Sequence, residues 1–280
     1  MSSPLESLED SLKHLINRGE IEVPMLPEVA NKALSLAQDS NSDASEMAQL
    51  IQSDQSLAGH VMRIANSVAY TPLSNLVSLQ QAIARLGMGT ISEIALSAAI
   101  GAKMFNTPGY EDYVAGIWRH ALATSLWSKE IARHCRNNVE VAFLAGLLHS
   151  IGRPAVLQTI LDLAKQQQIT LTKDDIQQLE NGHCQQVSQA VVNQWKMPVL
   201  VIEAVSSYTE HNGILTSGNQ VAEVIVGARF ATHMLMPERL DKETLLTLPA
   251  LATLNLYQDE AEALLDQTEI IKARLEGLSS

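Results

Sequence analysis

Residues 142–152 read AFLAGLLHSIG, and this stretch decides how the chain folds. The seven residues before His149 are apolar or small, which predicts a buried helix over 140–148. His149 ends this helix, and Gly152 marks the turn that follows. Burying a polar side chain costs free energy unless it finds a partner. His149 is therefore the first candidate for a functional residue.

Capping residues and turn signals predict helices along the rest of the chain. In the first half of the chain, the predicted helices span 3–17, 27–37, 78–86 and 90–104, and two more helices begin at Asp43 and Asp54. Beyond these, helices are predicted over 110–136, 154–167, 172–179, 183–195, 199–208, 220–236 and 259–275. No segment shows the period-two alternation of a half-buried strand. The pattern therefore predicts an all-α fold.

The best internal boundary is the sequence Asn-Thr-Pro-Gly at 106–109, because proline and glycine interrupt regular structure. It divides the chain into a helical subdomain over 1–105, a second over 106–237 and a C-terminal extension over 238–280. The apolar residues of the extension favour a helix that packs against the hydrophobic core of the same chain. A docking or dimerisation helix is the alternative.

Composition excludes several classes of partner. The formal net charge of −12 repels phosphate backbones, so we expect no nucleic acid. No apolar run approaches the ~20 residues that span a bilayer, so we expect no membrane. The two cysteines, Cys135 and Cys184, form no C-x-x-C motif, and the first ten residues are acidic, unlike a signal peptide. These features predict a cytoplasmic protein.

Four histidines are candidates for a metal site: His120, His149, His183 and His211. Glu210 precedes the last of them and adds a carboxylate. Imidazole binds zinc, iron, nickel or manganese, and helix ends let such side chains converge. Spacing alone does not show convergence, and an ordinary core or surface role is the alternative for each of these histidines.

Residues 145–152 resemble the GLLHDIG signature of the HD phosphohydrolase superfamily. More particularly, the first half of the chain is similar to the HDOD family of bacterial signalling domains, and the matching pieces continue into the second half. The matching pieces are Met25-Leu26-Pro27, Leu50-Ile51-x-x-Asp54-x-x-Leu57, Asn66-Ser67-x-x-Tyr70, Ala82-Ile83-x-x-Leu86-Gly87, Trp118-x-His120 and Trp195-x-x-Pro198. The resemblance covers about 23–235 and implies an HD-domain-like helical bundle packed against an N-terminal helical subdomain.

The resemblance also shows where this chain departs from active members of the superfamily. Those members bind divalent metals through a first His, a His-Asp pair and a later Asp. The corresponding residues here are His120, His149-Ser150 and Ala228, so both carboxylates are missing. Hydrolysis needs a metal held strongly enough to generate hydroxide near neutral pH. Without those carboxylates we expect catalysis by the superfamily mechanism to be lost.

The histidines, with or without Glu210, could still hold a divalent metal such as zinc, nickel, iron or manganese in a structural site. The alternative is a polar vestige filled by hydrogen bonds and water. Apart from such a metal, no cofactor is predicted.

The resemblance implies a non-catalytic bacterial signal-transduction or regulatory module that acts through protein or ligand binding. Its signalling partner would act in trans, and a homo-oligomer is left open. The alternative is a metal-dependent phosphohydrolase that acts on a nucleotide or cyclic dinucleotide through an unusual histidine-rich site.

Overall fold

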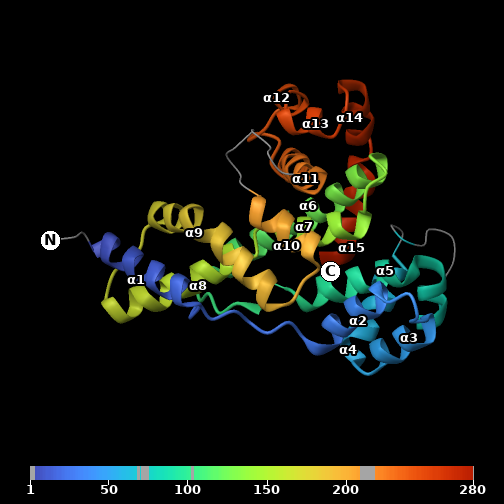
Figure 1. The fold of residues 1–280 in the computed structure, drawn as a ribbon, viewed down its shortest axis with the longest axis horizontal. Coiled ribbons are helices and arrows are strands. Elements are labelled where there is room, and N and C mark those ends of the chain that lie inside the picture. The colour runs from blue at the N-terminus through green and yellow to red at the C-terminus, as the bar shows by residue number, and fades with distance from the viewer. Residues whose placement is uncertain (1–3, 68–69, 71–75, 102–103, 209–217, 280) are drawn as a thin grey trace. The chain divides into compact units, whose positions relative to one another are not determined.

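A computed structural model describes residues 4–67, 70, 76–101, 104–208 and 218–279. Within these ranges the chain is helical and contains no strand, which confirms the predicted all-α class (Figure 1). Contacts divide the chain into two compact units. The large unit comprises Met1–Pro24 and Ala102–Gln258, and the small unit comprises Met25–Gly101 and Asp259–Ser280.

The small unit is built around one long helix. Its helices are α2 (Glu28–Gln38), α3 (Ala44–Gln52), α4 (Gln55–Ala65), α5 (Leu79–Ala99) and α15 (Thr268–Ser279), with α14 (Gln258–Leu265) leading into the last. Helices α2, α3, α4 and α15 all contact α5. Gly87, at φ 81°, breaks α5 where the predicted helix over 78–86 was expected to end. The second part of α5 ends at Ala99, earlier than the predicted residue 104.

Two predicted caps in the small unit are confirmed. The Asp43 side chain accepts hydrogen bonds from the backbone N–H groups of Ser45 and Glu46, and Glu46 completes the capping box. The Asp54 carboxylate accepts a hydrogen bond from the backbone N–H of Leu57. These bonds satisfy donors that the first turn of each helix would otherwise leave unpaired.

We expect Asp43→Ala to lower the free energy of unfolding of the small unit by about 1 kcal/mol, because two backbone donors lose their acceptor. Urea denaturation followed by circular dichroism would measure this change. Ser40→Ala, at an exposed position just before the cap, is the matched control. Equal stability of the two variants would contradict the prediction.

The large unit surrounds the stretch 142–152. Its helices are α1 (Pro4–Arg18), α6 (Glu111–His134), α7 (Val139–Leu148), α8 (Gly152–Gln167), α9 (Lys173–Gln194), α10 (Val199–Ser207), α11 (Asn219–Leu235), α12 (Lys242–Leu246) and α13 (Pro249–Thr253). Helix α6 packs against α7 and α11, while α8 packs against α9. Every residue of α7 from Val141 to Leu148 is buried, as its apolar sequence predicts.

Helix α9 differs from its prediction. Helices over 172–179 and 183–195 were predicted, with a turn at Asn181-Gly182, but α9 is continuous from Lys173 to Gln194. A glycine inside a helix costs only about 1 kcal/mol relative to alanine, and the packing of α9 on α8 and α10 outweighs it. The Thr172 capping box is confirmed. Helices α12 and α13 were not predicted, and α14 and α15 divide the predicted helix over 259–275.

The two units also differ from the predicted ranges 1–105, 106–237 and 238–280. Helix α1 belongs to the large unit, because Leu8 and Leu12 are buried and α1 contacts α8 and α9. Helix α15 belongs to the small unit, where it contacts α5. Both segments are distant in sequence from the helices they cover, so a boundary drawn along the chain could not assign them.

The prediction that no apolar run approaches the length of a membrane span was wrong: the segment Val139–Gln167, which comprises α7 and α8, is long and apolar enough to cross a membrane. However, 83% of the apolar 18-residue stretch within it is buried inside the protein. Core helices of globular proteins have the same composition, so the apolar character of this segment is explained by burial.

Candidate functional site

The site is assembled where α6, α7 and α11 meet, and glycines allow this close approach. A Cβ added to Gly146 of α7 would lie 2.8 Å from the Ser125 Cα of α6. A Cβ added to Gly227 of α11 would lie 2.9 Å from the Ser128 backbone nitrogen and would also meet its Oγ. Real side chains do not tolerate such distances, so both positions require glycine to hold the three helices together.

This packing brings together two of the four histidines that are candidates for a metal site. His120 lies on α6 and His149 directly follows α7, and their ring centroids are 6.1 Å apart. Tyr208, at the end of α10, places its ring edge-to-face with His149 at 4.8 Å. His149 is only 4% exposed. His149, the first candidate from the sequence, therefore lies buried in a cluster of aromatic and imidazole rings.

His149 has a defined tautomer. Its Nδ1 lies 2.7 Å from the Gly146 carbonyl oxygen, so Nδ1–H donates to that carbonyl. The proton on Nδ1 leaves a lone pair on Nε2. This orientation is common among histidines that bind metals through Nε2, and a buried structural histidine shows it as well.

His120 has the opposite arrangement. Its Nε2 lies 3.0 Å from the Thr232 hydroxyl oxygen. That hydroxyl donates to the Ala228 carbonyl at 2.8 Å, so its oxygen accepts a hydrogen bond from His120 Nε2–H. A protonated ring nitrogen cannot coordinate a metal. Ala228 stands where the superfamily carries its later Asp. Its backbone carbonyl thus orients the Thr232 hydroxyl, which is hydrogen-bonded to His120.

His183 is not part of this pair of histidines. It is buried on α9, and its Nε2 lies 3.4 Å from a carboxylate oxygen of Glu9 on α1. The pKa of Glu9 is lowered, chiefly by its hydrogen bond with Lys13, against the opposing effect of burial and with a further contribution from His183. His183 therefore helps to attach α1 to the large unit.

The structure does not test the remaining predicted ligands. Glu210 and His211 lie outside the described residues. Ser150 is buried, 6% exposed, and supplies at most a neutral hydroxyl. Among the residues that the structure places, no three His, Cys, Asp or Glu side chains converge as a metal site would require. The donors present do not fit the metal centre of the active superfamily members.

A second polar cluster lies beside the motif and was not predicted. The Tyr113 hydroxyl donates to Glu180 Oε2 at 2.5 Å, and Arg153 Nη1 lies 3.4 Å from the same oxygen. Glu180 is fully buried. Burial, followed by the bond to Glu180, raises the pKa of Tyr113. The cluster joins α6, α8 and α9, and the distance between its members in the sequence explains why no local signal revealed it.

Comparisons with known proteins agree with this architecture. The HDOD domain family matches residues 23–211. A search of the curated proteins found no match.

Solved structures share the fold. A "putative metal-dependent phosphohydrolase" from Shewanella amazonensis SB2B is 21% identical, with a TM-score of 0.75 over 97% of this chain and 99% of that one. An HDOD domain protein of unknown function from Geobacter sulfurreducens is 21% identical, with a TM-score of 0.71 over 98% and 99% of the two chains. A "putative signal transduction protein" from Marinobacter aquaeolei VT8 is 22% identical, with a TM-score of 0.66 over 99% of this chain and 67% of that one.

Proposed function

This chain belongs to the HDOD domain family, and we propose that it is a non-catalytic bacterial signal-transduction module that acts by binding another protein. The observation that carries the proposal is the hydrogen-bonded series from His120 through Thr232 to Ala228. It occupies Nε2 of His120 with a hydrogen bond and includes the residue that stands where the superfamily places a carboxylate.

The chemistry of the site supports this proposal. Hard divalent ions need anionic oxygen ligands, and positions 150 and 228 supply a hydroxyl and a methyl group. Loss of a residue that merely orients a ligand costs roughly 10–100-fold in affinity or activity, so loss of two ligands costs more. A cation bound weakly in this way does not lower the pKa of water enough for hydrolysis near neutral pH.

The partner and the compartment are part of the same proposal. A signalling protein that binds in trans fits a module without its own chemistry, and the net charge of −12 disfavours nucleic acid. We place the protein in the cytoplasm, where the Cys135 and Cys184 thiols, which form no disulfide, stay reduced.

We expect no hydrolysis of bis-p-nitrophenyl phosphate or cyclic di-GMP above the protein-free background, with Mn²⁺ or Mg²⁺ present. A chromogenic assay and chromatography of the nucleotide would measure this, each with and without a chelator. Turnover that the chelator abolishes and that His149→Ala removes, while the exposed His14→Ala retains it, would establish the alternative phosphohydrolase.

Metal analysis of protein purified without a histidine tag separates the remaining outcomes. We expect substoichiometric zinc, nickel, iron and manganese. A stoichiometric metal with turnover would overturn the proposal. A stoichiometric metal without turnover would assign the histidines a structural or ligand-sensing site in a protein that is still non-catalytic.

A further inference from the structure

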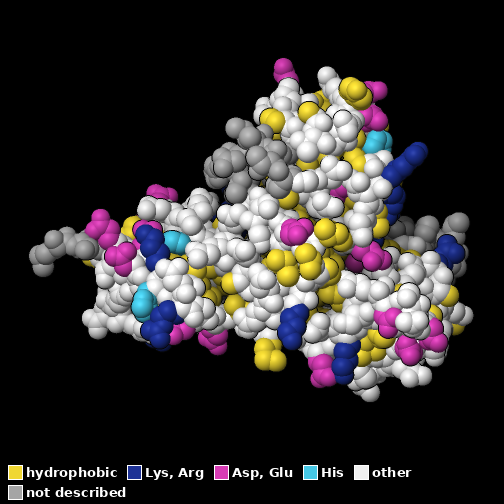
Figure 2. Space-filling view, in the orientation of Figure 1, with side chains coloured by type: hydrophobic (Ala, Val, Ile, Leu, Met, Phe, Trp, Pro, Cys, Tyr) yellow, Lys and Arg dark blue, Asp and Glu magenta, His cyan; other side chains and the backbone are white. Residues whose placement is uncertain are grey.

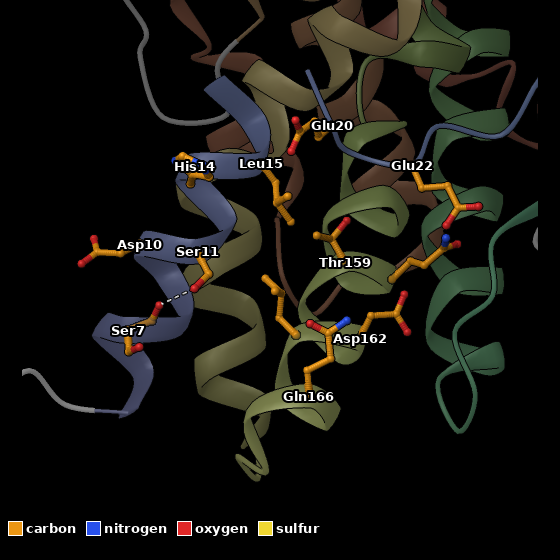
Figure 3. Close-up of a pocket in the computed structure, with 12 residues that line it drawn as sticks. Ser7, Asp10, Ser11, His14, Leu15, Glu20, Glu22, Thr159, Asp162 and Gln166 are labelled. Atoms are coloured by element: carbon orange, nitrogen blue, oxygen red, sulfur yellow. Dashed lines mark hydrogen bonds between the residues drawn. The ribbon is translucent and has the colours of Figure 1, made fainter. Parts of the chain in front are cut away.

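A groove runs between α1 and α8 in the large unit (Figure 3). Its volume is about 910 Å³, at the upper end of the range for small-molecule pockets. Helices α1 and α8 form two of its walls. The segment that follows α1, with Glu20 and Glu22, forms the third wall. The groove is separate from the cluster around His149, since none of that cluster's residues lines it.

The groove follows one face of each helix. Ser7, Ser11 and Leu15 are spaced by four residues along α1, and Thr159, Leu163 and Gln166 follow α8 with spacings of four and three. Such spacings place side chains in a row along a helix. Figure 3 shows Leu15 directed toward the space between the helices, opposite Thr159. These residues therefore line the space between α1 and α8 from both sides.

The floor of this groove has its polar groups satisfied within the protein. The Gln158 side-chain oxygen accepts a hydrogen bond from the Asn106 backbone N–H at 2.8 Å. The Thr159 hydroxyl donates to the Ala155 carbonyl at 2.9 Å. Leu163 is buried beside them. An occupant would therefore meet Leu15 and Leu163 as apolar contacts and would find few unused polar groups at the floor.

The rim of the groove is acidic. Its lining residues include Asp10, Glu20, Glu22 and Asp162, and no Lys or Arg. Arg18 pairs with Glu20 at 2.9 Å. In the part of the chain that the structure describes, neither Glu22 nor Asp162 forms an ion pair, and both are exposed. Figure 2 shows Asp and Glu side chains over the surface around α1, interspersed with a few Lys and Arg.

We propose that this groove binds a basic amphipathic segment of the signalling partner, with apolar side chains against Leu15 and Leu163 and Lys or Arg beside Glu22 and Asp162. The inference rests on the proposed role in protein binding. A floor whose polar groups are already hydrogen-bonded, beside two leucines and a carboxylate rim, suits a cationic amphipathic helix. It disfavours a second copy of this chain, whose net charge is −12.

The groove joins a helix outside the family match to a helix inside it. The HDOD match begins at residue 23, after α1 and after Glu22, whereas α8 lies inside the matched range. The matched range contains the α8 side of the groove, and the segment before it contains α1, Glu20 and Glu22.

The test measures binding of a fluorescein-labelled amphipathic helix of about 15 residues, with leucines on one face and lysines on the other, to the full chain by fluorescence anisotropy. We expect saturable micromolar binding. Glu22→Gln with Asp162→Asn should weaken it roughly tenfold, about threefold for each charge. The matched control, Glu203→Gln with Glu238→Gln, removes two exposed carboxylates elsewhere in the large unit and should change it less than about twofold.

Two further measurements locate the site. Ser7→Trp fills the groove without changing charge and should weaken binding, and the Leu15 and Leu163 methyl resonances should shift when the peptide is added. Equal weakening by the two charge-removing pairs would show attraction to net charge alone and overturn the proposal. Absence of binding would overturn it too, as would a dimer that dissociates when Glu22 and Asp162 are replaced. The hydrolysis and metal assays do not depend on the groove, so its failure leaves the proposed function standing.

Discussion

Gly152→Ala should destabilise the large unit by roughly 3 kcal/mol or more. A Cβ at this position would meet the Cys184 carbonyl oxygen and lie 2.6 Å from the Ser188 backbone nitrogen. Both contacts are with the backbone of α9, so they cannot be relieved by rotating a side chain. The Gly152 N–H also donates to the Ser188 hydroxyl at 2.9 Å, which fixes the start of α8 against α9.

The matched control is the same substitution on the facing helix. Gly182 lies inside α9, and a Cβ there would have no atom within 4 Å. Gly182→Ala should stabilise the protein by about 0.5–1 kcal/mol, because alanine loses less backbone freedom on folding. Urea denaturation followed by circular dichroism would measure both variants. A Gly152→Ala protein as stable as the wild type would refute the close contact between α8 and α9.

Glu223→Gln should stabilise the protein in a manner that depends on pH. Glu223 lies on α11 and is fully buried. Burial raises the pKa of its carboxyl from 4.5 to about 7, against a hydrogen bond from the Asn137 side chain at 2.6 Å that acts to lower it. The folded state therefore keeps a proton, between pH 4.5 and about 7, that the unfolded chain has released.

The sign of the effect follows from this difference. A state that holds the extra proton is favoured at low pH, so the contribution of Glu223 to stability falls as the pH rises through this window. The change in pKa from 4.5 to about 7 corresponds to roughly 3 kcal/mol. Glutamine does not titrate, so Glu223→Gln should differ little from the wild type at pH 4.5 and should be more stable by about that amount at pH 8.

Denaturant unfolding at a series of pH values would measure this difference. The control is Glu203→Gln, which removes an exposed carboxylate from α10. It should leave the dependence of stability on pH almost unchanged. A constant difference between Glu223→Gln and the wild type at every pH would show that the Glu223 carboxyl titrates alike in the folded and unfolded states.

The sequence by itself determined the features that depend on neighbouring residues. Asp43, Asp54 and Thr172 cap helices because a side chain bonds to a backbone group only a few residues away. The buried helix before His149 was also evident, since its apolar surface has no exposed side. The resemblance to the family was enough to recognise that positions 150 and 228 lack the carboxylates of active superfamily members.

Only the tertiary structure decided what these residues touch. Thr232 reaches His120 across 112 positions of the chain, and Glu9 reaches His183 across 174. No local pattern encodes such distances, because they arise from how whole helices pack. The same reason explains Glu223, whose pKa depends on the helices that bury it. It also explains α9, in which tertiary contacts outweigh the turn that Asn181-Gly182 indicates.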